Sequence, residues 1–200
     1  MERSYYWEHP DDPQIQNQAE VSFEPDGLRA NGIQIGPGYS ARWILEALDD
    51  WTTQAIHVHV LGEGWNRMLK LERDSDGVWT SETSVSGEQP AELAAPDTHP
   101  GIAAEEDLSE ALDCDLGMCP VTNTMPIRRL DLLGQEVPET RLIMAWIEMP
   151  SLRVIASDQY YSSVDERTVR YKSGTRGVDV ELQVDEDGVV LHYPDLARRL

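Results

Sequence analysis

Short apolar segments that alternate with polar positions and end at turn residues run through most of the chain. Alternation with a period of two is the pattern of a strand with one buried face. Residues 39–48 and 52–61 show it best, and Asp49-Asp50 separates them. In the first segment one face carries Tyr39, Ala41, Trp43, Leu45 and Ala47. In the second, Ile56, Val58 and Val60 lie opposite Ala55, His57 and His59. The pattern therefore predicts a hairpin built from these two strands.

The remaining strand candidates are equally short. They cover residues 66–73, 78–83, 126–133, 139–149, 152–163, 166–172, 177–185 and 189–193. Hairpin-type pairs punctuate the chain at Asp26-Gly27, Asn31-Gly32, Asp76-Gly77 and Asp187-Gly188. Many strands with few short helices predict a mainly β protein, with a single highly curved antiparallel sheet or barrel.

Three segments lack the strand pattern. Residues 1–20 are polar and proline-containing, so we expect a flexible N-terminal segment that adds little to a core, ahead of one β domain over residues 21–200. Residues 86–111 hold seven acidic residues, three prolines and no Lys or Arg, which predicts a solvated acidic insertion that is dispensable for folding, with one helical turn near Glu105–Ala111. Residues 195–200 are the other helical candidate.

Charge and composition narrow the partners and the compartment. The formal net charge of −21 disfavours nucleic acid and anionic membrane surfaces. There is no export signal and no run of about 20 apolar residues, so we expect a cytoplasmic protein without membrane insertion. Cys114 and Cys119 are then expected to stay reduced, and their spacing does not form a zinc site.

Standard catalytic signatures are missing: there is no phosphate-binding loop, no dinucleotide fingerprint, no Gly-x-Ser-x-Gly elbow and no His-Glu-x-x-His. Two pairs of side chains give a weaker indication of metal binding. His57 and His59 share one strand face, and Asp113 and Asp115 share another, a geometry that suits a metal ion beside a phosphate. Half-exposed strand histidines and a chance Asp-x-Asp in so acidic a chain are the simpler interpretations.

Aromatic and basic residues suggest binding. The chain has six Trp and seven Tyr but a single Phe. Aromatic side chains that also carry a hydrogen-bonding group suit both solvent-accessible pockets and barrel rims. Arg128 and Arg129 are adjacent, so in a strand one guanidinium would reach an anionic head group while the other forms salt bridges. Two structural salt bridges are the alternative.

A longer motif surrounds that arginine pair. The run Asp113-Cys-Asp-Leu-Gly-Met-Cys-Pro-Val-Thr-Asn-Thr-Met-Pro-Ile-Arg-Arg-Leu130 resembles the signature of the bacterial putative glycolipid-binding family. Further matches follow in order, at residues 145–154, Gln159-Tyr-Tyr161, Arg170-Tyr171 and residues 184–194. The resemblance covers roughly residue 21 to the C-terminus and is strongest over residues 112–194. It implies a curved antiparallel sheet, comparable in outline to periplasmic carriers of acyl chains, and an amphiphilic ligand. The chain departs from the family pattern at Met125, at Gln54 and in the length of the acidic insertion.

Our leading hypothesis is a protein that binds a glycolipid or another amphiphile in the concave side of a curved sheet and uses no cofactor. The expected ligand-binding residues are Asn123, Arg128, Arg129, Trp146, Gln159, Tyr161 and Tyr171. Asn123 is favoured, because it precedes a predicted strand, where side chains often line a barrel mouth. A metal-dependent phosphoester hydrolase using Asp113, Asp115, His57 or His59 is the first alternative, and it requires these side chains to converge. An acidic protein-interaction module is the second. The sequence does not predict the oligomeric state.

Overall fold

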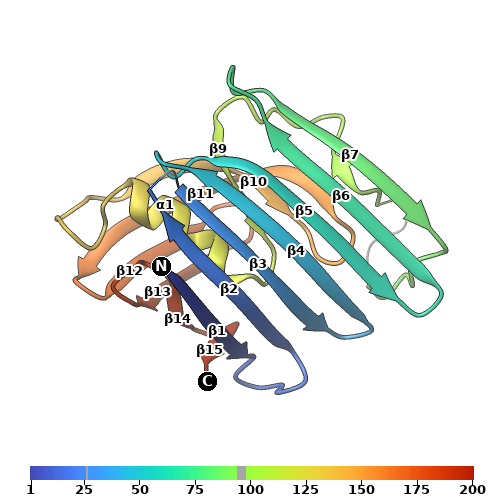
Figure 1. Cartoon of the computed structure of the whole chain (residues 1–200), viewed down its shortest axis with the longest axis horizontal. Coiled ribbons are helices and arrows are strands. Elements are labelled where there is room, and N and C mark those ends of the chain that lie inside the picture. Colours follow the sequence, from blue (N-terminus) through green and yellow to red (C-terminus); the bar gives the residue numbers. More distant parts are fainter. Residues whose placement is uncertain (26, 94–97) are drawn as a thin grey trace.

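The computed structural model describes residues 1–25, 27–93 and 98–200, and fifteen strands among these residues form one sheet (Figure 1). The first half of the chain supplies β1 (Glu2–Glu8), β2 (Gln16–Glu24), β3 (Gly27–Gly36), β4 (Tyr39–Leu48), β5 (Thr53–Gly62), β6 (Trp65–Arg73) and β7 (Trp79–Ser86). The second half supplies β8 (Gly101–Ile102), β9 (Ala111–Leu116), β10 (Thr140–Ile147), β11 (Arg153–Asp165), β12 (Thr168–Ser173), β13 (Val178–Val184), β14 (Val190–Tyr193) and β15 (Ala197–Arg199). A short 3-10 helix, η1 (Pro120–Asn123), leads directly into α1 (Thr124–Arg129).

The sheet is continuous across the two halves because the N-terminal and C-terminal strands pair. The spatial order is β7-β6-β5-β4-β3-β2-β1-β15-β14-β13-β12-β11-β10-β9. Neighbours along this path are antiparallel except β9 and β10, and β8 adds a short parallel pairing to β11. The sheet is strongly curved but does not close into a barrel, since β7 and β9 end the path.

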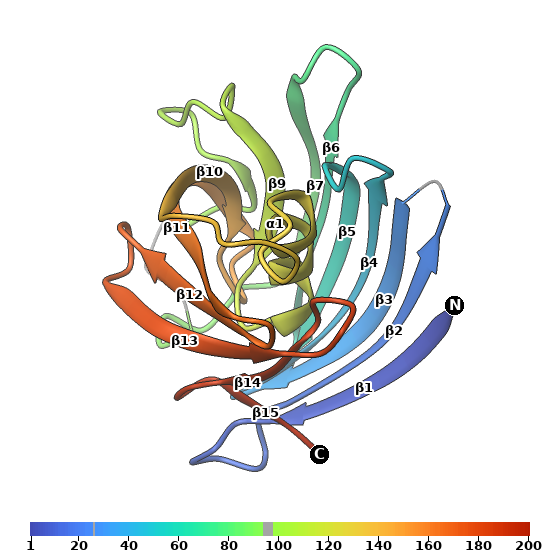
Figure 2. The ribbon, with the colours of Figure 1, turned by 90° about the vertical axis from the view of Figure 1, so that its left-hand side faces the viewer.

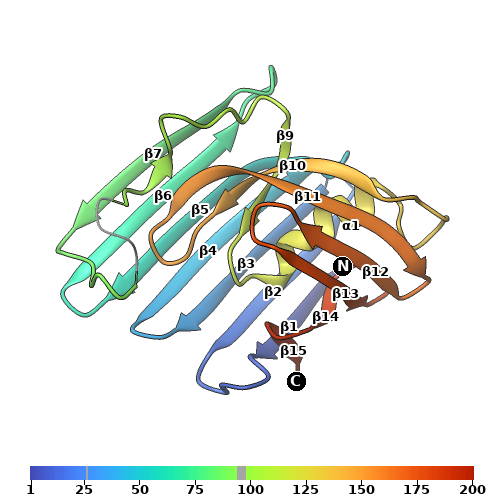
Figure 3. The same cartoon turned by 180° about the vertical axis from the view of Figure 1, so that it is seen from behind.

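The two halves of the sheet curl toward each other around η1 and α1 (Figure 2), and the second half lies behind the first in the view of Figure 1 and in front of it in Figure 3. Side chains from both halves form one hydrophobic core. Several hydrogen bonds join the halves directly. The Trp7 indole donates to the carbonyl of Val190 at 2.8 Å, and the Trp79 indole donates to that of Ala111 at 2.9 Å. The concave side is therefore a packed interior, with the short helices inside it.

Most predicted strands are confirmed. The predicted pair 39–48 and 52–61 is β4 and β5, which pair as antiparallel neighbours, and β4 buries Ala41, Trp43, Leu45 and Ala47 as the alternation indicated. The candidates 66–73, 78–83, 139–149, 152–163, 166–172, 177–185 and 189–193 correspond to β6, β7 and β10–β14 within a few residues at each end.

The predicted strand 126–133 is wrong, because residues 126–129 belong to α1 and the residues after them form turns. Residues 119–127 are all buried, so the alternation of a half-buried strand cannot apply to them. A fully buried segment must pair its own backbone groups, which a helix does without a neighbouring strand. Arg128 and Arg129 lie in the last helical turn, where basic side chains are favoured by the helix dipole.

The N-terminal segment is not peripheral. Its residues 2–8 form β1, and Tyr5 and Trp7 are 0% and 1% exposed, so the expectation that little of it joins the core is wrong. Residues 197–199 form β15 against β1 and β14 instead of a helical end. The alternation of β1 is hidden because the exposed position between the two buried rings is a third aromatic residue, Tyr6.

Two of the four predicted turn pairs, at Gly77 and Gly188, form turns, and Asn31-Gly32 does not. Asn31-Gly32 lies inside β3, where a Cβ on Gly32 would stand 2.4 Å from the ring of Trp43 on β4, so this glycine makes room for an indole instead of forming a turn. Asp26 lies outside the described residues. Gly77 and Gly188 do occupy turns, with φ of 84° and 81°.

The acidic insertion packs against the sheet at its C-terminal end. Glu105 pairs with Arg153, the carboxylate of Glu106 accepts the backbone amide of Ala156 at 2.8 Å, and Leu108 is 6% exposed. Turns replace the helical turn predicted near Glu105–Ala111, and Ala111 already begins β9.

Within the described ranges, no helix has the length and apolar character needed to cross a membrane.

Candidate functional site

A buried carboxylate, Asp115, is the centre of a polar cluster on the concave side of the sheet. Asp115 is the penultimate residue of β9 and is 6% exposed. One carboxylate oxygen, Oδ1, accepts the hydroxyl of Thr122 at 2.9 Å. The other, Oδ2, accepts the side-chain amide of Gln159 at 2.6 Å. A buried charge is tolerated only when such donors surround it, so η1 and β11 are needed to hold this carboxylate.

The chain of hydrogen bonds continues from Gln159 through Tyr161 to Asn123. The Tyr161 hydroxyl donates to Oε1 of Gln159 at 3.1 Å and accepts the Asn123 amide at 2.8 Å. All three side chains are nearly or fully buried. Since η1 carries Asn123 and β11 carries the other two, the network locks the short helix to the sheet.

Arg176 covers this network from the turn between β12 and β13. Its Nη2 donates to the Tyr171 hydroxyl at 2.6 Å and to Oδ2 of Asp115 at 3.2 Å. The guanidinium carbon also lies 4.7 Å from the ring centroid of Trp146 on β10. The Arg176 side chain is 26% exposed, whereas the Asp115 side chain is 9% exposed. Arg176 is therefore the boundary between the buried polar cluster and solvent.

A small cavity of about 10 Å³ remains beneath Arg176. That volume is close to the minimum for one water molecule. The cavity is lined by polar residues, which are Asp115, Asn123, Tyr171, Arg176 and Tyr193, and by Leu116, Met118, Cys119 and Leu196. The site thus combines a buried carboxylate and neutral polar groups with one cation and several apolar side chains.

Burial fixes the protonation of the site. It raises the pKa of the Tyr161 and Tyr171 hydroxyls well above the ordinary value, and the nearby Asp115 carboxylate adds to this. Burial disfavours the charge on Arg176, but the Asp115 carboxylate and the hydroxyls of Tyr171, Tyr193 and Tyr161 together outweigh burial and raise the Arg176 pKa. The site therefore offers neutral hydroxyl and amide groups around the ion pair of Asp115 and Arg176.

Five of the seven predicted ligand-binding residues lie at this site. They are Asn123, Trp146, Gln159, Tyr161 and Tyr171. The structure places the other two, Arg128 and Arg129, elsewhere. Arg128 stacks on Trp51, 4.8 Å from the ring centroid, and Arg129 pairs with Asp113 at 2.6 Å.

The four residues of the metal hypothesis do not come together. His57 and His59 lie on the outer face of β5, between positions that point into the core. Asp113 and Asp115 are buried and each is paired with an arginine. In the parts of the chain that the structure describes, no group of three or more His, Cys, Asp or Glu side chains could hold a metal ion. The hydrolase hypothesis required convergence and is contradicted by this arrangement.

Sequence reasoning missed Arg176 and Thr122. Arg176 stands in the turn Ser173-Gly-Thr-Arg-Gly177, which looks like an ordinary hairpin connection, and Gly177 has a φ of 68°. Thr122 did have a signal, because it lies beside Asn123 in the motif that carries the family resemblance. Nothing in the sequence indicates that the turn folds back over Asp115.

Fold and site define a class of β protein with one open, highly curved antiparallel sheet and an occluded polar site on its concave side. The family model described as putative glycolipid-binding matches residues 4–199, and the chain belongs to this family. A crystal structure of a DUF1089 family protein from Pseudomonas aeruginosa is similar, with a TM-score of 0.69, 26% sequence identity and 92% of each chain covered. No curated protein matches the chain significantly.

Proposed function

We propose that this protein binds the polar head group of an amphiphile, of the glycolipid class, at the Asp115 site after Arg176 turns outward. The observation that carries the proposal is the partly exposed Arg176 guanidinium, which contacts a buried carboxylate that is hydrogen-bonded at both oxygens. The name of the family supports the ligand class.

The donors and acceptors of the site suit a sugar. Hydroxyl groups both donate and accept, so they match a carboxylate beside neutral amide and phenol groups. When Arg176 leaves, the ring face of Trp146 becomes free to pack against the apolar face of a sugar ring. The indole Nε1 of Trp146 is buried and has no hydrogen-bond partner among the described residues, so it offers a donor to a ligand.

The packing of the core restricts where an acyl chain lies. Core side chains and the short helices occupy the interior between the two halves of the sheet. The proposed mode therefore buries the head group alone and lays the start of the apolar tail against Met118 and Leu196, which line the cavity. This replaces the expected carrier that encloses the whole amphiphile in the concavity.

Turning Arg176 outward is feasible from its local contacts. Its bond to Asp115 is long at 3.2 Å, and Gly174 and Gly177 flank the turn on either side. A ligand hydroxyl can replace the guanidinium at Asp115 and at Tyr171. The cost of exposing Asp115 is thereby offset by the new hydrogen bonds.

The test uses n-octyl β-D-glucopyranoside below its micelle concentration as the probe, with glucose and octan-1-ol as the two halves of that molecule. Binding is measured by calorimetry and by tryptophan fluorescence. We expect the glucoside to bind more tightly than either half. Asp115→Asn should weaken binding about tenfold or more, since a hydrogen bond to a charged group is worth about 1.5–3 kcal/mol.

Arg170→Met is the matched control, because Arg170 lies on the same strand as Tyr171 and pairs with Asp179 on the surface. We expect it to leave binding unchanged, whereas Arg176→Met removes the cover and tightens binding. Circular dichroism checks that each variant is folded. Glucoside binding that is equal in wild-type and folded Asp115→Asn protein, or no binding at millimolar concentration, would refute the proposal.

A further inference from the structure

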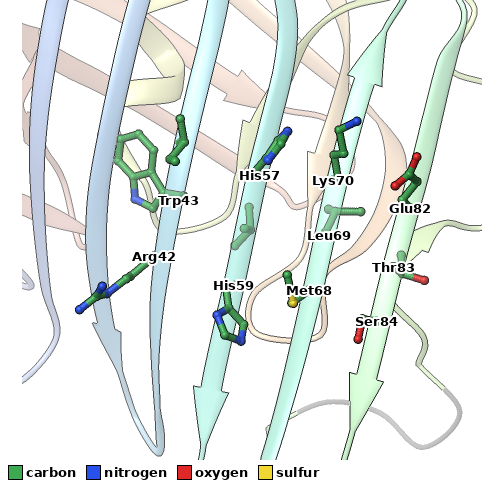
Figure 4. A pocket seen from close by; sticks show the side chains of 12 residues that line it. Arg42, Trp43, His57, His59, Met68, Leu69, Lys70, Glu82, Thr83 and Ser84 are labelled. Carbon is green, nitrogen blue, oxygen red and sulfur yellow. The ribbon is translucent and has the colours of Figure 1, made fainter.

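The outer face of strands β3–β7, on the opposite side of the sheet from the core, carries a second hollow. It has a volume of about 390 Å³ and lies over β4, β5, β6 and β7 (Figure 4). The side chains that project from this face belong to alternating strand positions. Register places Arg42, His59, Met68 and Ser84 in one row across the strands and Ile44, His57, Lys70 and Glu82 in the next.

This face exposes more apolar surface than a solvated sheet face needs. Six large apolar side chains are 38–56% exposed on β3–β6: Ile33, Ile35, Ile44, Leu48, Leu61 and Met68. Contiguous exposed apolar patches on a monomer usually mark a binding surface. A volume near 400 Å³ is within the range of small-molecule sites.

The charge of the face is unusual for this chain. In a protein of net charge −21, the row that runs from Gln18 on β2 through Ile33, Arg42, His59 and Met68 to Ser84 contains no carboxylate. The row beside it, from Gln16 through Ile35, Ser40, Leu61 and Asn66 to Ser86, contains none either. The third row, which holds Ile44, has carboxylates only at its two ends, Glu20 and Glu82. The two carboxylate-free rows form a clearing in the acidic surface, and this clearing contains Ile33, Ile35, Leu61 and Met68.

Arg42 is the available cation in this clearing. It makes no ion pair in the described part of the chain, and His59 and His57 stand on the neighbouring strand. Lys70 is already neutralised, because its Nζ lies 2.6 Å from Glu72 and Glu82 faces it across the strands. A single anionic group at Arg42 is what the local charges accommodate.

We propose that this outer hollow binds a single-chain anionic amphiphile, with its anionic group on Arg42 and its alkyl chain across His59 and Met68. The size of the hollow favours this ligand over a protein, because a volume of about 390 Å³ is that of a small-molecule site.

The site is separate from the Asp115 site, which lies on the other face of the sheet, so the two proposals stand or fall independently. The probe is sodium dodecanoate below its micelle concentration, with dodecyltrimethylammonium as the arm of equal chain length and opposite charge. Calorimetry measures affinity, and the NMR signal of the Met68 methyl group reports the location. We expect dodecanoate to bind and to shift that signal, and the cation to do neither.

Arg42→Gln should weaken dodecanoate binding about tenfold, whereas Arg29→Gln should not, because Arg29 is exposed on β3 outside the clearing and lies beside Glu24. Asp115→Asn should leave dodecanoate binding unchanged, which separates this proposal from the preceding one. Four results would overturn it: equal binding of the cationic amphiphile, no effect of Arg42→Gln, binding of anionic phospholipid vesicles without binding of monomeric dodecanoate, or an Arg42-dependent dimer in sedimentation.

Discussion

The ion pair between Asp113 and Arg129 lets the effect of pH on stability be predicted. Asp113 is 0% exposed on β9 and lies against Arg129 at the end of α1. Burial raises the pKa of its carboxyl group from 3.8 to about 6, although the guanidinium of Arg129 opposes the rise. The folded state thus holds a proton on Asp113 more tightly than the unfolded state does.

The sign of the effect follows from that difference. A group whose pKa is raised in the folded state contributes stability below its unfolded pKa and loses that contribution as the pH rises through its folded pKa. The rise from 3.8 to about 6 corresponds to about 3 kcal/mol. Between pH 4 and pH 7, wild-type protein should lose most of this amount relative to a variant that cannot titrate at position 113.

Asp113→Asn is that variant. It also loses the ion pair with Arg129, so its absolute stability at one pH is not informative. The measurement is the free energy of unfolding in urea, followed by circular dichroism at several pH values from 4 to 7. We expect the advantage of wild type over Asp113→Asn to grow by roughly 2–3 kcal/mol as the pH falls across this range.

Asp179→Asn serves as the control with the opposite sign, because Arg170 lowers the pKa of this exposed carboxyl group. Its contribution to stability is present above the unfolded pKa and is lost as the pH falls. If the curves of wild type and Asp113→Asn stay parallel from pH 4 to pH 7, the desolvation argument for Asp113 is refuted.

Three further substitutions test the packing. Gly32→Ala should lower the free energy of unfolding by about 1–3 kcal/mol, because the new Cβ overlaps the Trp43 ring; an unchanged melting temperature would contradict this. Leu108→Ala should cost about 2–5 kcal/mol in urea unfolding, and a cost near zero would restore the view of the acidic insertion as peripheral. Tyr5→Phe removes a 2.7 Å hydrogen bond to buried Asp185 and should cost about 1–3 kcal/mol by thermal melting, with no loss if water replaces the hydroxyl.

The sequence was informative wherever one strand face meets the core and the other meets solvent. This condition holds for β4, β5 and β6, whose boundaries were predicted within one residue. It fails for residues 119–127, which are buried on every side, so periodicity could not distinguish helix from strand there. In β1 the exposed Tyr6 stands between the buried Tyr5 and Trp7, so three consecutive aromatic residues hid the alternation.

The site was predictable in part for a related reason. Asn123, Gln159 and Tyr161 belong to the segments that carry the family resemblance, so the resemblance alone pointed to them. Arg176 depends on how a turn folds back over β9, 61 residues away along the chain from Asp115. Contacts at such separations follow from the curvature of the whole sheet, which no local pattern encodes.

The pairing of β1 with β15 has a consequence for synthesis on the ribosome. Strand β1 is synthesised before β15, so this edge of β1 stays unpaired until residues 197–199 have left the exit tunnel. During that interval the nascent first half exposes an unpaired strand edge, together with the apolar face that will later meet β9–β15. Such intermediates are prone to aggregate, so the yield of folded protein should depend on how quickly the ribosome proceeds from β7 to β15.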